Sequence, residues 1–205
     1  MIREHIAEIR EQLPSEVKLV AVSKFHPAEA IREAYAAGQR RFGENRPQEF
    51  AAKVEELKDL DLEWHFIGHL QTNKLKLVLP YADLVQSVDS QHLLDAIQDW
   101  GKVNDKVIRV LLELHIGAEE TKSGFKEEEV LDILFRAEKY KNISFCGLMG
   151  MASHTDNEDD IRADFARIAD FKELSIGMSG DWKLALDYGA TIVRIGTAIF
   201  GERQY

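Results

Sequence analysis

The sequence predicts a closed barrel of eight parallel strands, an α/β fold of the (β/α)8 TIM type. Short apolar runs alternate with segments of helical periodicity along the whole chain, which indicates a parallel sheet. The alternation allows an open doubly wound sheet or a closed barrel, and eight strand–helix units favour the barrel. No Gly- or Pro-rich linker divides the 205 residues, so we expect a single domain over residues 1–205.

The strands are predicted from short apolar runs that end at polar or glycine-containing segments. The first of them, residues 17–22, reads VKLVAV and is followed directly by Ser23 and Lys24. The full set of predicted strands is 17–22, 41–43, 64–67, 84–88, 107–114, 144–149, 174–176 and 192–195.

The helices are predicted from apolar residues at helical spacing. An N-terminal helix over residues 2–13 places Ile2, Ile6 and Ile9 on one face. A second helix begins at Pro27, which suits a first helical turn, and closes at Gly38. The remaining predicted helices are 47–60, 70–79, 91–103, 126–140, 161–174 and 182–188, with a short one after Gly196 and Thr197.

Composition limits the classes of partner. The net charge of −10 argues against nucleic-acid binding through a basic patch, because phosphate neutralisation needs clustered Lys and Arg. No run approaches the roughly 20 apolar residues of a membrane span, and the charged N-terminus is unlike a signal peptide. The single cysteine, Cys146, cannot form an internal disulfide. We therefore expect a cytoplasmic monomer with no nucleic-acid or membrane partner.

Functional side chains are expected at the carboxyl end of the strands, where such barrels carry their sites. Lys24 follows the first strand at this end, although this feature alone favours a solvated lysine at the end of a strand. The loop 177–181 (GMSGD) after strand seven contains Met178 and Ser179, and Gly196 and Thr197 follow strand eight. Small residues in these two loops leave backbone N–H groups free to hold a phosphate.

Barrel closure brings Lys24 close to Arg194, although 170 positions separate them. Two cations drawn together repel unless an anionic or electron-rich group lies between them. A phosphate-bearing aldehyde cofactor meets this requirement, because its aldehyde carbon can condense with a lysine amine. Pyridoxal 5′-phosphate (PLP) is such a cofactor, and its sites pair the lysine with an Asp or Arg at the ring nitrogen.

Six segments resemble the pyridoxal phosphate homeostasis proteins, also called the YggS or PROSC family. These segments are LVAVSK (19–24), FGENRPQEF (42–50), WHFIGHLQTNK (64–74), ETKSGF (120–125), LSIGMSGDW (174–182) and VRIGTAIFGER (193–203). The resemblance spans nearly the whole chain. It implies a barrel like the N-terminal domain of alanine racemase, without that enzyme's second, β-rich domain.

The resemblance also implies a role for each matching residue. Lys24 would form the Schiff base with PLP, and Arg194 would contact its ring nitrogen. The residues expected to border the ring are Asn45, His65, Gly68 and Gln71, and those expected to hold the phosphate are Met178, Ser179, Gly196 and Thr197. The chain departs from the family at Phe25 and His26, where members often read VSKTKP, and in MGMASHT (149–155), so substrate-side details are open.

The function implied is PLP homeostasis, in which the protein buffers the cofactor and transfers it transiently to apo-enzymes that use PLP. No catalytic residue is expected. No metal site is expected either, because His65 and His69 lack the acidic residue that a HExxH pair needs. Two alternatives stay open. One is a PLP-dependent amino-acid racemase or lyase of low activity, and the other is a phosphosugar-type barrel enzyme that forms a substrate imine on Lys24.

Overall fold

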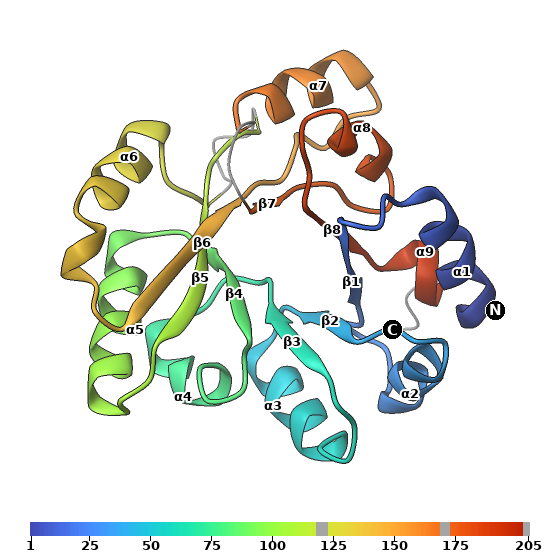
Figure 1. Cartoon of the computed structure of the whole chain (residues 1–205), viewed down its shortest axis with the longest axis horizontal. Helices are drawn as coiled ribbons and strands as arrows, with labels where there is room; N and C mark the ends of the chain where they lie inside the picture. Colours follow the sequence, from blue (N-terminus) through green and yellow to red (C-terminus); the bar gives the residue numbers. More distant parts are fainter. Residues whose placement is uncertain (118–122, 169–172, 203–205) are drawn as a thin grey trace.

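The eight strands close into one barrel. In the computed structural model they follow one another around the barrel in chain order, all pairs are parallel, and the last strand pairs with the first (Figure 1). This confirms the predicted (β/α)8 class over the open sheet. The structure describes residues 1–117, 123–168 and 173–202.

All eight predicted strands are present, with ends that differ by at most one residue. They are β1 (Lys18–Val22), β2 (Arg41–Glu44), β3 (Glu63–Phe66), β4 (Leu84–Val88), β5 (Ile108–Glu113), β6 (Ile143–Met149), β7 (Leu174–Ser175) and β8 (Ile192–Ile195). At the closure, Val20 of β1 lies opposite Arg194 of β8. The predicted neighbourhood of strands one and eight is therefore confirmed.

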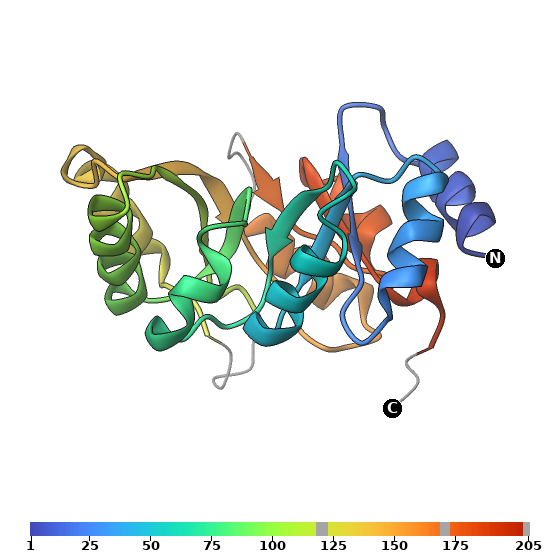
Figure 2. The same ribbon diagram turned by 90° about the horizontal axis from the view of Figure 1, so that it is seen from below.

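The helices form a ring around the barrel (Figures 1 and 2). Within the described residues they are α1 (Ile2–Gln12), α2 (Ala28–Ala36), α3 (Pro47–Glu56), α4 (Leu75–Val78), α5 (Gln91–Val103), α6 (Glu127–Phe135), α7 (Glu158–Ala166), α8 (Trp182–Leu186) and α9 (Thr197–Phe200), with 3-10 turns η1 (Thr72–Lys74) and η2 (Ala137–Lys139). None of these described helices is long and apolar enough to cross a membrane.

Four predicted helices differ from those observed. The segment predicted over 47–60 ends earlier, as α3 at Glu56. The segment predicted as one helix over 70–79 is η1 followed by α4, because Lys74 leaves the helical region at φ −108° and ψ 0°. The segment predicted over 126–140 ends as α6 at Phe135 and continues as η2. The segment predicted over 161–174 begins earlier, at Glu158, because the Asn157 side chain accepts a hydrogen bond from the Asp159 amide at 3.0 Å.

The C-terminal part of that predicted helix was also wrong in one respect, since Leu174 belongs to β7. Residues 169–172 lie outside the described residues, as do 120–122 of the ETKSGF segment and residue 203 of VRIGTAIFGER.

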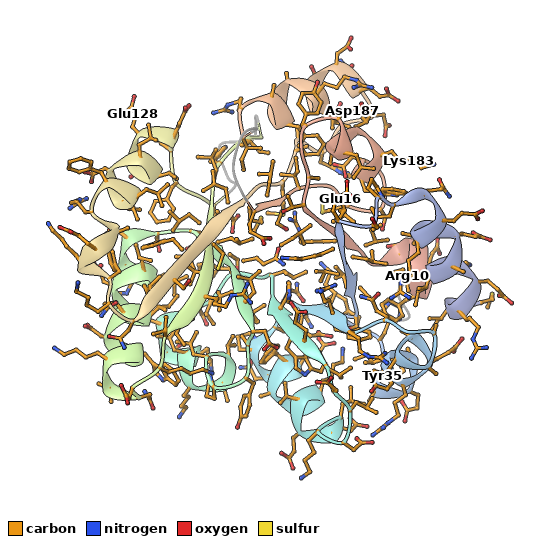
Figure 3. All side chains as sticks on the ribbon, viewed as in Figure 1. Arg10, Glu16, Tyr35, Glu128, Lys183 and Asp187 are labelled. Atoms are coloured by element: carbon orange, nitrogen blue, oxygen red, sulfur yellow. The ribbon has the colours of Figure 1, made fainter. Side chains whose placement is uncertain are left out.

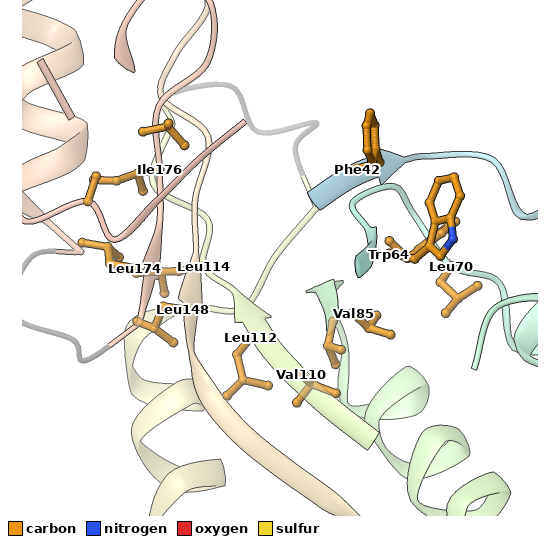
Figure 4. Packing of buried hydrophobic residues seen from close by; sticks show 14 of the residues in the cluster. Phe42, Trp64, Leu70, Val85, Val110, Leu112, Leu114, Leu148, Leu174 and Ile176 are labelled. Carbon is orange, nitrogen blue, oxygen red and sulfur yellow. The ribbon is translucent and has the colours of Figure 1, made fainter. Parts of the chain in front are cut away.

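Most apolar side chains pack between the barrel and the helices. The large side chains of this layer that are almost fully buried include Phe42, Phe50 and Phe66. Phe50 of α3 meets the rings of Trp64 and Phe66 edge-on, with centroids 5.8 and 5.9 Å apart. Figure 4 shows part of this layer, in which Val85, Val110 and Leu112 line the same side of neighbouring strands. Charged residues such as Glu128 and Asp187 lie on the outer helices (Figure 3).

A second, smaller apolar cluster fills the inside of the barrel. Its members come from alternating positions of five strands and are Val20, Leu84, Leu111, Met149 and Ile192. Because neighbouring residues of a strand face opposite sides, Leu19 and Ala21 face the helices while Val20 faces inward. This alternation decides which polar side chains point into the barrel.

The predicted N-terminal helix is confirmed as α1, which packs against α2 and α9 (Figure 1). Its buried face carries Ile6 and Ile9. His5 Nδ1 lies 2.9 Å from the carbonyl oxygen of Ile199, which ties α1 to the helix after β8. The helix therefore covers the outside of the barrel next to the β8–β1 closure.

Candidate functional site

The carboxyl ends of the strands gather several predicted residues at one mouth of the barrel. Lys24 follows β1, Asn45 follows β2 and Gly68 follows β3, and all three are half-buried. Because the strands are parallel and closed, these positions share one rim. The predicted phosphate-loop residues belong to the same rim, since they follow β7 and β8.

The loops after β7 and β8 touch each other through Ser179. Its Oγ accepts hydrogen bonds from the backbone amides of Gly196 and Ala198, at 3.3 and 3.5 Å. Two amides thus converge on one neutral hydroxyl at long distances. Such a pair of amides suits an anionic oxygen better than a hydroxyl, because charge-assisted hydrogen bonds are shorter and stronger. The geometry fits a phosphate group at this place.

Two further features shape the β7–α8 loop. The amide of Met178 donates to Asp181 Oδ1 at 2.6 Å, which closes the turn, while the Met178 side chain is exposed. Gly177 adopts φ +91°, and a Cβ there would lie 2.8 Å from the Ala185 Cβ and 2.9 Å from the Trp182 Cα. The loop therefore needs glycine at 177 to reach over the mouth. Beside it lies an open pocket of about 880 Å³, lined in part by Met178 and Ser179.

Arg194 points into the barrel below these loops. It is 4% exposed, and its Nη1 donates to the carbonyl oxygen and the hydroxyl of Ser175, both at 2.7 Å. Its Nη2 donates to the Gly150 carbonyl oxygen at 3.0 Å. Burial lowers the pKa of Arg194 to about 10, and the nearby carboxylates of Glu113 and Asp181 oppose that shift. The guanidinium therefore keeps its charge at neutral pH.

The two carboxylates near Arg194 weaken the prediction that Lys24 and Arg194 need an anionic ligand between them. The sequence reasoning considered the two cations alone. In the structure, the carboxylates of Glu113 and Asp181 also act on Arg194 and favour its charged form. Neither carboxylate could be assigned to Arg194 from sequence, because the pairing depends on three different loops and strands.

A directional chain of hydrogen bonds crosses the barrel from Arg194 to β3. The Ser175 hydroxyl donates to Gln86 Oε1 at 2.6 Å, and Gln86 Nε2 contacts His65 Nδ1 at 2.6 Å. His65 Nε2 in turn lies 3.0 Å from Glu63 Oε1. Neutral His65 protonated on Nε2 satisfies both of its contacts. His65 is 1% exposed, so it lies inside the barrel and has both ring nitrogens occupied.

Gly68 brings the third strand's loop against Asn45. A Cβ at Gly68 would lie 2.2 Å from the Asn45 carbonyl oxygen, which only glycine avoids. The Gly68 carbonyl oxygen accepts from the Ser87 hydroxyl at 2.5 Å. Asn45 Oδ1 is a buried atom without a hydrogen-bond partner among the described residues. An unpartnered buried oxygen at the mouth is what a ligand donor could satisfy.

The remaining side of the mouth is acidic. Burial raises the pKa of Glu113, and the charge of Asp89 acts in the same direction, while the Ser123 hydroxyl bonds Glu113 Oε1 at 3.0 Å. His69, exposed at the rim, bonds Asp89 Oδ2 at 2.7 Å through its Nδ1. His65 and His69 thus have different partners, Gln86 and Glu63 for His65 and Asp89 for His69. No group of three or more potential metal ligands occurs among the residues that the structure describes.

Several polar residues of the site were missed by the sequence reasoning. Gln86 and Ser175 lie within short apolar strands, and Glu113 ends one. A polar residue at an inward position of a buried strand is the signal that could have identified Gln86, since every residue of β4 is buried. Thr197 and Gln71 are exposed, and within the described part of the chain no side-chain hydrogen bond links either of them to the Ser179 loop.

The comparisons with known proteins agree with this architecture. The family model described as "Alanine racemase, N-terminal domain" matches residues 1–204. A curated relative from Aquifex aeolicus, named "Pyridoxal phosphate homeostasis protein", is 43% identical over 200 residues, which are 92% of this chain and 88% of the relative. A protein of the same name from Schizosaccharomyces pombe is 37% identical over 201 residues, 91% of this chain and 84% of the relative.

Solved structures extend the likeness to three dimensions. PipY of Synechococcus elongatus without PLP aligns at a TM-score of 0.92 and 39% identity, over 98% of this chain and 100% of that one. The PLP-bound form of PipY aligns at 0.89 and 38% identity, with the same coverage. Alanine racemase of Clostridium difficile aligns at 0.78 and 15% identity, over 100% of this chain and 60% of that one, which shows the fold alone.

Proposed function

The chain belongs to the pyridoxal phosphate homeostasis protein family, and from this premise we propose that it binds PLP at the barrel mouth as a Schiff base on Lys24. Residues 1–205 would form one PLP-binding domain. The PLP-bound relative PipY, similar over nearly the whole chain, supports this choice of ligand. The observation that carries the proposal is the meeting of the two small-residue loops at Ser179, within the rim that also bears Lys24.

The phosphate is assigned to the β7–α8 and β8–α9 loops. The amides of Gly196 and Ala198 would turn from the Ser179 hydroxyl to a phosphate oxygen, with the hydroxyl as a further donor. Thr197 and the backbone at Met178 border the same place. A dianionic phosphate makes stronger hydrogen bonds with these groups than a neutral oxygen does.

Lys24 is assigned to the aldehyde end. When PLP is bound it supplies an aldehyde carbon with which a primary amine forms a C=N bond, releasing water. Lys24 suits this role because it carries a primary amine and lies half-buried on the rim, directly after Ser23 at the end of β1. Asn45, beside Gly68, would border the ring through its unpartnered Oδ1.

Arg194 is assigned to the ring nitrogen, with His65 behind it. Ser175 and Gly150 hold the guanidinium in place, and the chain through Gln86 fixes His65. An arginine keeps its own proton, so it does not protonate the ring, and an unprotonated ring is a poorer electron sink. This feature favours a carrier that buffers PLP and hands it to apo-enzymes over a racemase or lyase.

The cellular setting is part of the same proposal. A single cysteine fits a reducing compartment, so we infer a cytosolic monomer that meets its recipient enzymes transiently. The acidic net charge of −10 argues against a nucleic-acid partner.

Spectral titration with PLP tests the proposal. The wild type should shift the PLP absorbance and retain a covalent adduct after borohydride reduction, while Lys24→Ala should lose the adduct. Lys183→Ala, an exposed lysine of α8 beside the Ser179 loop, is the matched control and should behave as the wild type. A wild type without an adduct would overturn the assignment of PLP to this mouth.

Chiral chromatography after prolonged incubation with amino acids separates the carrier from the enzyme. The carrier predicts negligible racemisation or lysis. A turnover near about 1 s⁻¹, within the ordinary range for enzymes, would replace the carrier with a PLP-dependent racemase or lyase.

A further inference from the structure

A cluster of buried charged and polar groups lies directly behind Lys24, between β1, β2 and α3. Lys53 Nζ, from α3, is 2.8 Å from Glu44 Oε1 and 2.7 Å from Glu49 Oε1. The side chains of Lys53 and Glu44 are 7% and 0% exposed. The same ammonium donates to the Ser23 carbonyl oxygen at 2.8 Å. We call Lys53, Glu44, Glu49 and Ser23 the Lys53 cluster.

The Lys53 cluster holds the backbone on both sides of Lys24. On the N-terminal side, the Ser23 carbonyl oxygen accepts from Lys53, and the Ser23 hydroxyl donates to Glu44 Oε1 at 2.6 Å. On the C-terminal side, the amide of Phe25 donates to Glu49 Oε1 at 2.7 Å. Glu49 Oε1 also accepts a hydrogen bond from Lys53 Nζ, so one ammonium links the backbone on the two sides of Lys24.

The backbone at Phe25 needs this support. Phe25 adopts φ +66°, a left-handed conformation that costs energy for a bulky residue. The guanidinium of Arg46 lies over the Phe25 ring, 4.4 Å from its centroid. The turn at residues 23–25 is therefore not its own energy minimum and persists because its surroundings hold it.

Strand alternation places the Lys53 cluster on the helix-facing side of β1. Leu19 and Ala21 face the helices, and Ser23 continues that side toward Glu44 and Lys53. Val20 faces the barrel interior, and Lys24 follows Ser23 in the turn after β1. The cluster thus acts on Lys24 through the backbone and lies behind it.

Stability alone is a weak reason for such a cluster. Taking an ammonium and a carboxylate out of water costs about as much as their attraction returns, and apolar side chains of similar size often stabilise as well. Burial also raises the pKa of Glu44, and Lys53 and Ser23 offset this rise only in part. The Oε2 atom of Glu44 has no hydrogen-bond partner among the described residues. A requirement for exact backbone placement accounts for the retained charges better.

We propose that Lys53 is a positioning residue for Lys24: with Glu49 it fixes the backbone at Ser23 and Phe25 so that the Lys24 amine points into the mouth at the aldehyde carbon. This inference rests on the proposed function. It assigns a role to a lysine of the outer helix layer that contacts no ligand itself.

The test separates the rate at which Lys24 reacts with the aldehyde from the affinity of the pocket for the ring and phosphate. Pyridoxine 5′-phosphate carries an alcohol in place of the aldehyde, so it reports ring and phosphate binding without a Schiff base. PLP with borohydride trapping reports the rate at which the covalent adduct forms. For Lys53→Met we expect adduct formation to slow about tenfold or more, since misplacing a reacting group by about 1 Å costs up to about a hundredfold. The dissociation constant for pyridoxine 5′-phosphate should stay within about twofold.

Two further variants keep the test decisive if Lys53→Met folds poorly. The double variant Lys53→Met/Glu44→Gln removes the buried carboxylate together with its counter-ion, which avoids an unpaired buried charge. Glu49→Ala removes the acceptor of the Phe25 amide together with one carboxylate partner of Lys53, and it leaves the pair of Lys53 with Glu44. Both should show the same slow adduct formation with unchanged pyridoxine 5′-phosphate binding.

Matched controls exclude a general loss of stability. Lys106→Met removes a lysine that also donates to backbone, to the carbonyl oxygens of Leu79 and Pro80 at 2.9 and 2.8 Å. Glu55→Ala removes a carboxylate of the same helix α3 from an exposed ion pair. Both controls should trap PLP at the wild-type rate.

The outcomes distinguish the role of Lys53 from the binding of PLP on Lys24. Lys53 does not position Lys24 if Lys53→Met or its double variant traps PLP as fast as the wild type. The same holds if PLP trapping and pyridoxine 5′-phosphate affinity fall by the same factor. If the wild type itself forms no adduct, the proposed function fails instead.

Discussion

Gly68→Ala is expected to destabilise the protein through a single backbone contact. The added Cβ would lie 2.2 Å from the Asn45 carbonyl oxygen and 2.7 Å from the Asn45 Cα, far inside contact distance. Both neighbours are backbone atoms, so no flexible side chain can move away. The loop is also fixed from the other side, because the Ser87 hydroxyl holds the Gly68 carbonyl oxygen. Overpacking of this kind costs about 1–3 kcal/mol.

Thermal unfolding followed by circular dichroism measures this cost. For a chain of this size each kcal/mol lowers Tm by about 2–4 °C, so a fall of about 2–12 °C is expected. PLP affinity should fall as well, because the clash displaces Asn45 at the mouth. Gly180→Ala is the control, since a Cβ at Gly180 meets nothing within 4 Å, and it should change stability by less than about 1 kcal/mol. Equal Tm values for the two alanine variants would refute the close-approach argument.

Three further predictions concern the barrel and its lining. Burial raises the pKa of Glu113, so its contribution to stability is complete below the ordinary carboxyl pKa and is lost as pH rises through the raised value. Glu113→Gln should therefore raise Tm more at about pH 8 than at about pH 4, and a pH-independent difference would contradict this. Phe50→Ala should lower the free energy of unfolding in urea by about 3–5 kcal/mol, because the ring is fully buried against Trp64 and Phe66; a loss under about 1 kcal/mol would disprove that packing. Arg194→Lys keeps the charge but not the fork that bridges two carbonyl oxygens, so both Tm and PLP affinity should drop, and an unchanged PLP spectrum would remove Arg194 from the site.

The order of the elements could be predicted because the periodicity of this sequence changes repeatedly from strand to helix. The run KLVAV at β1 and the run LVQSV at β4 are short and nearly all buried, which is typical of strands covered on both sides. The closure that brings β8 beside β1 then follows from eight parallel units, and the pairing of β7 with β8 brings the loops of Ser179 and Gly196 into contact. These inferences need only local pattern and the geometry of the fold.

The polar interior could not be predicted in the same way. Lys53 lies among apolar neighbours on the buried face of α3, and its partner Glu44 ends a strand. Local periodicity assigns such residues to the surface, since charged side chains are rarely buried unless they are paired. The pairing joins residues from different elements, so only the three-dimensional structure reveals it. For the same reason, the series of hydrogen bonds from Arg194 through Gln86 to His65 could not be predicted from the sequence.

Peptide mapping after borohydride reduction tests the central claim most directly. A reduced adduct on Lys24 blocks tryptic cleavage there, so the label should appear by mass spectrometry in one uncut peptide spanning residues 19–32. The account predicts this peptide as the dominant labelled species at one PLP per chain. A label found mainly on another lysine, such as Lys53 or Lys183, would contradict it.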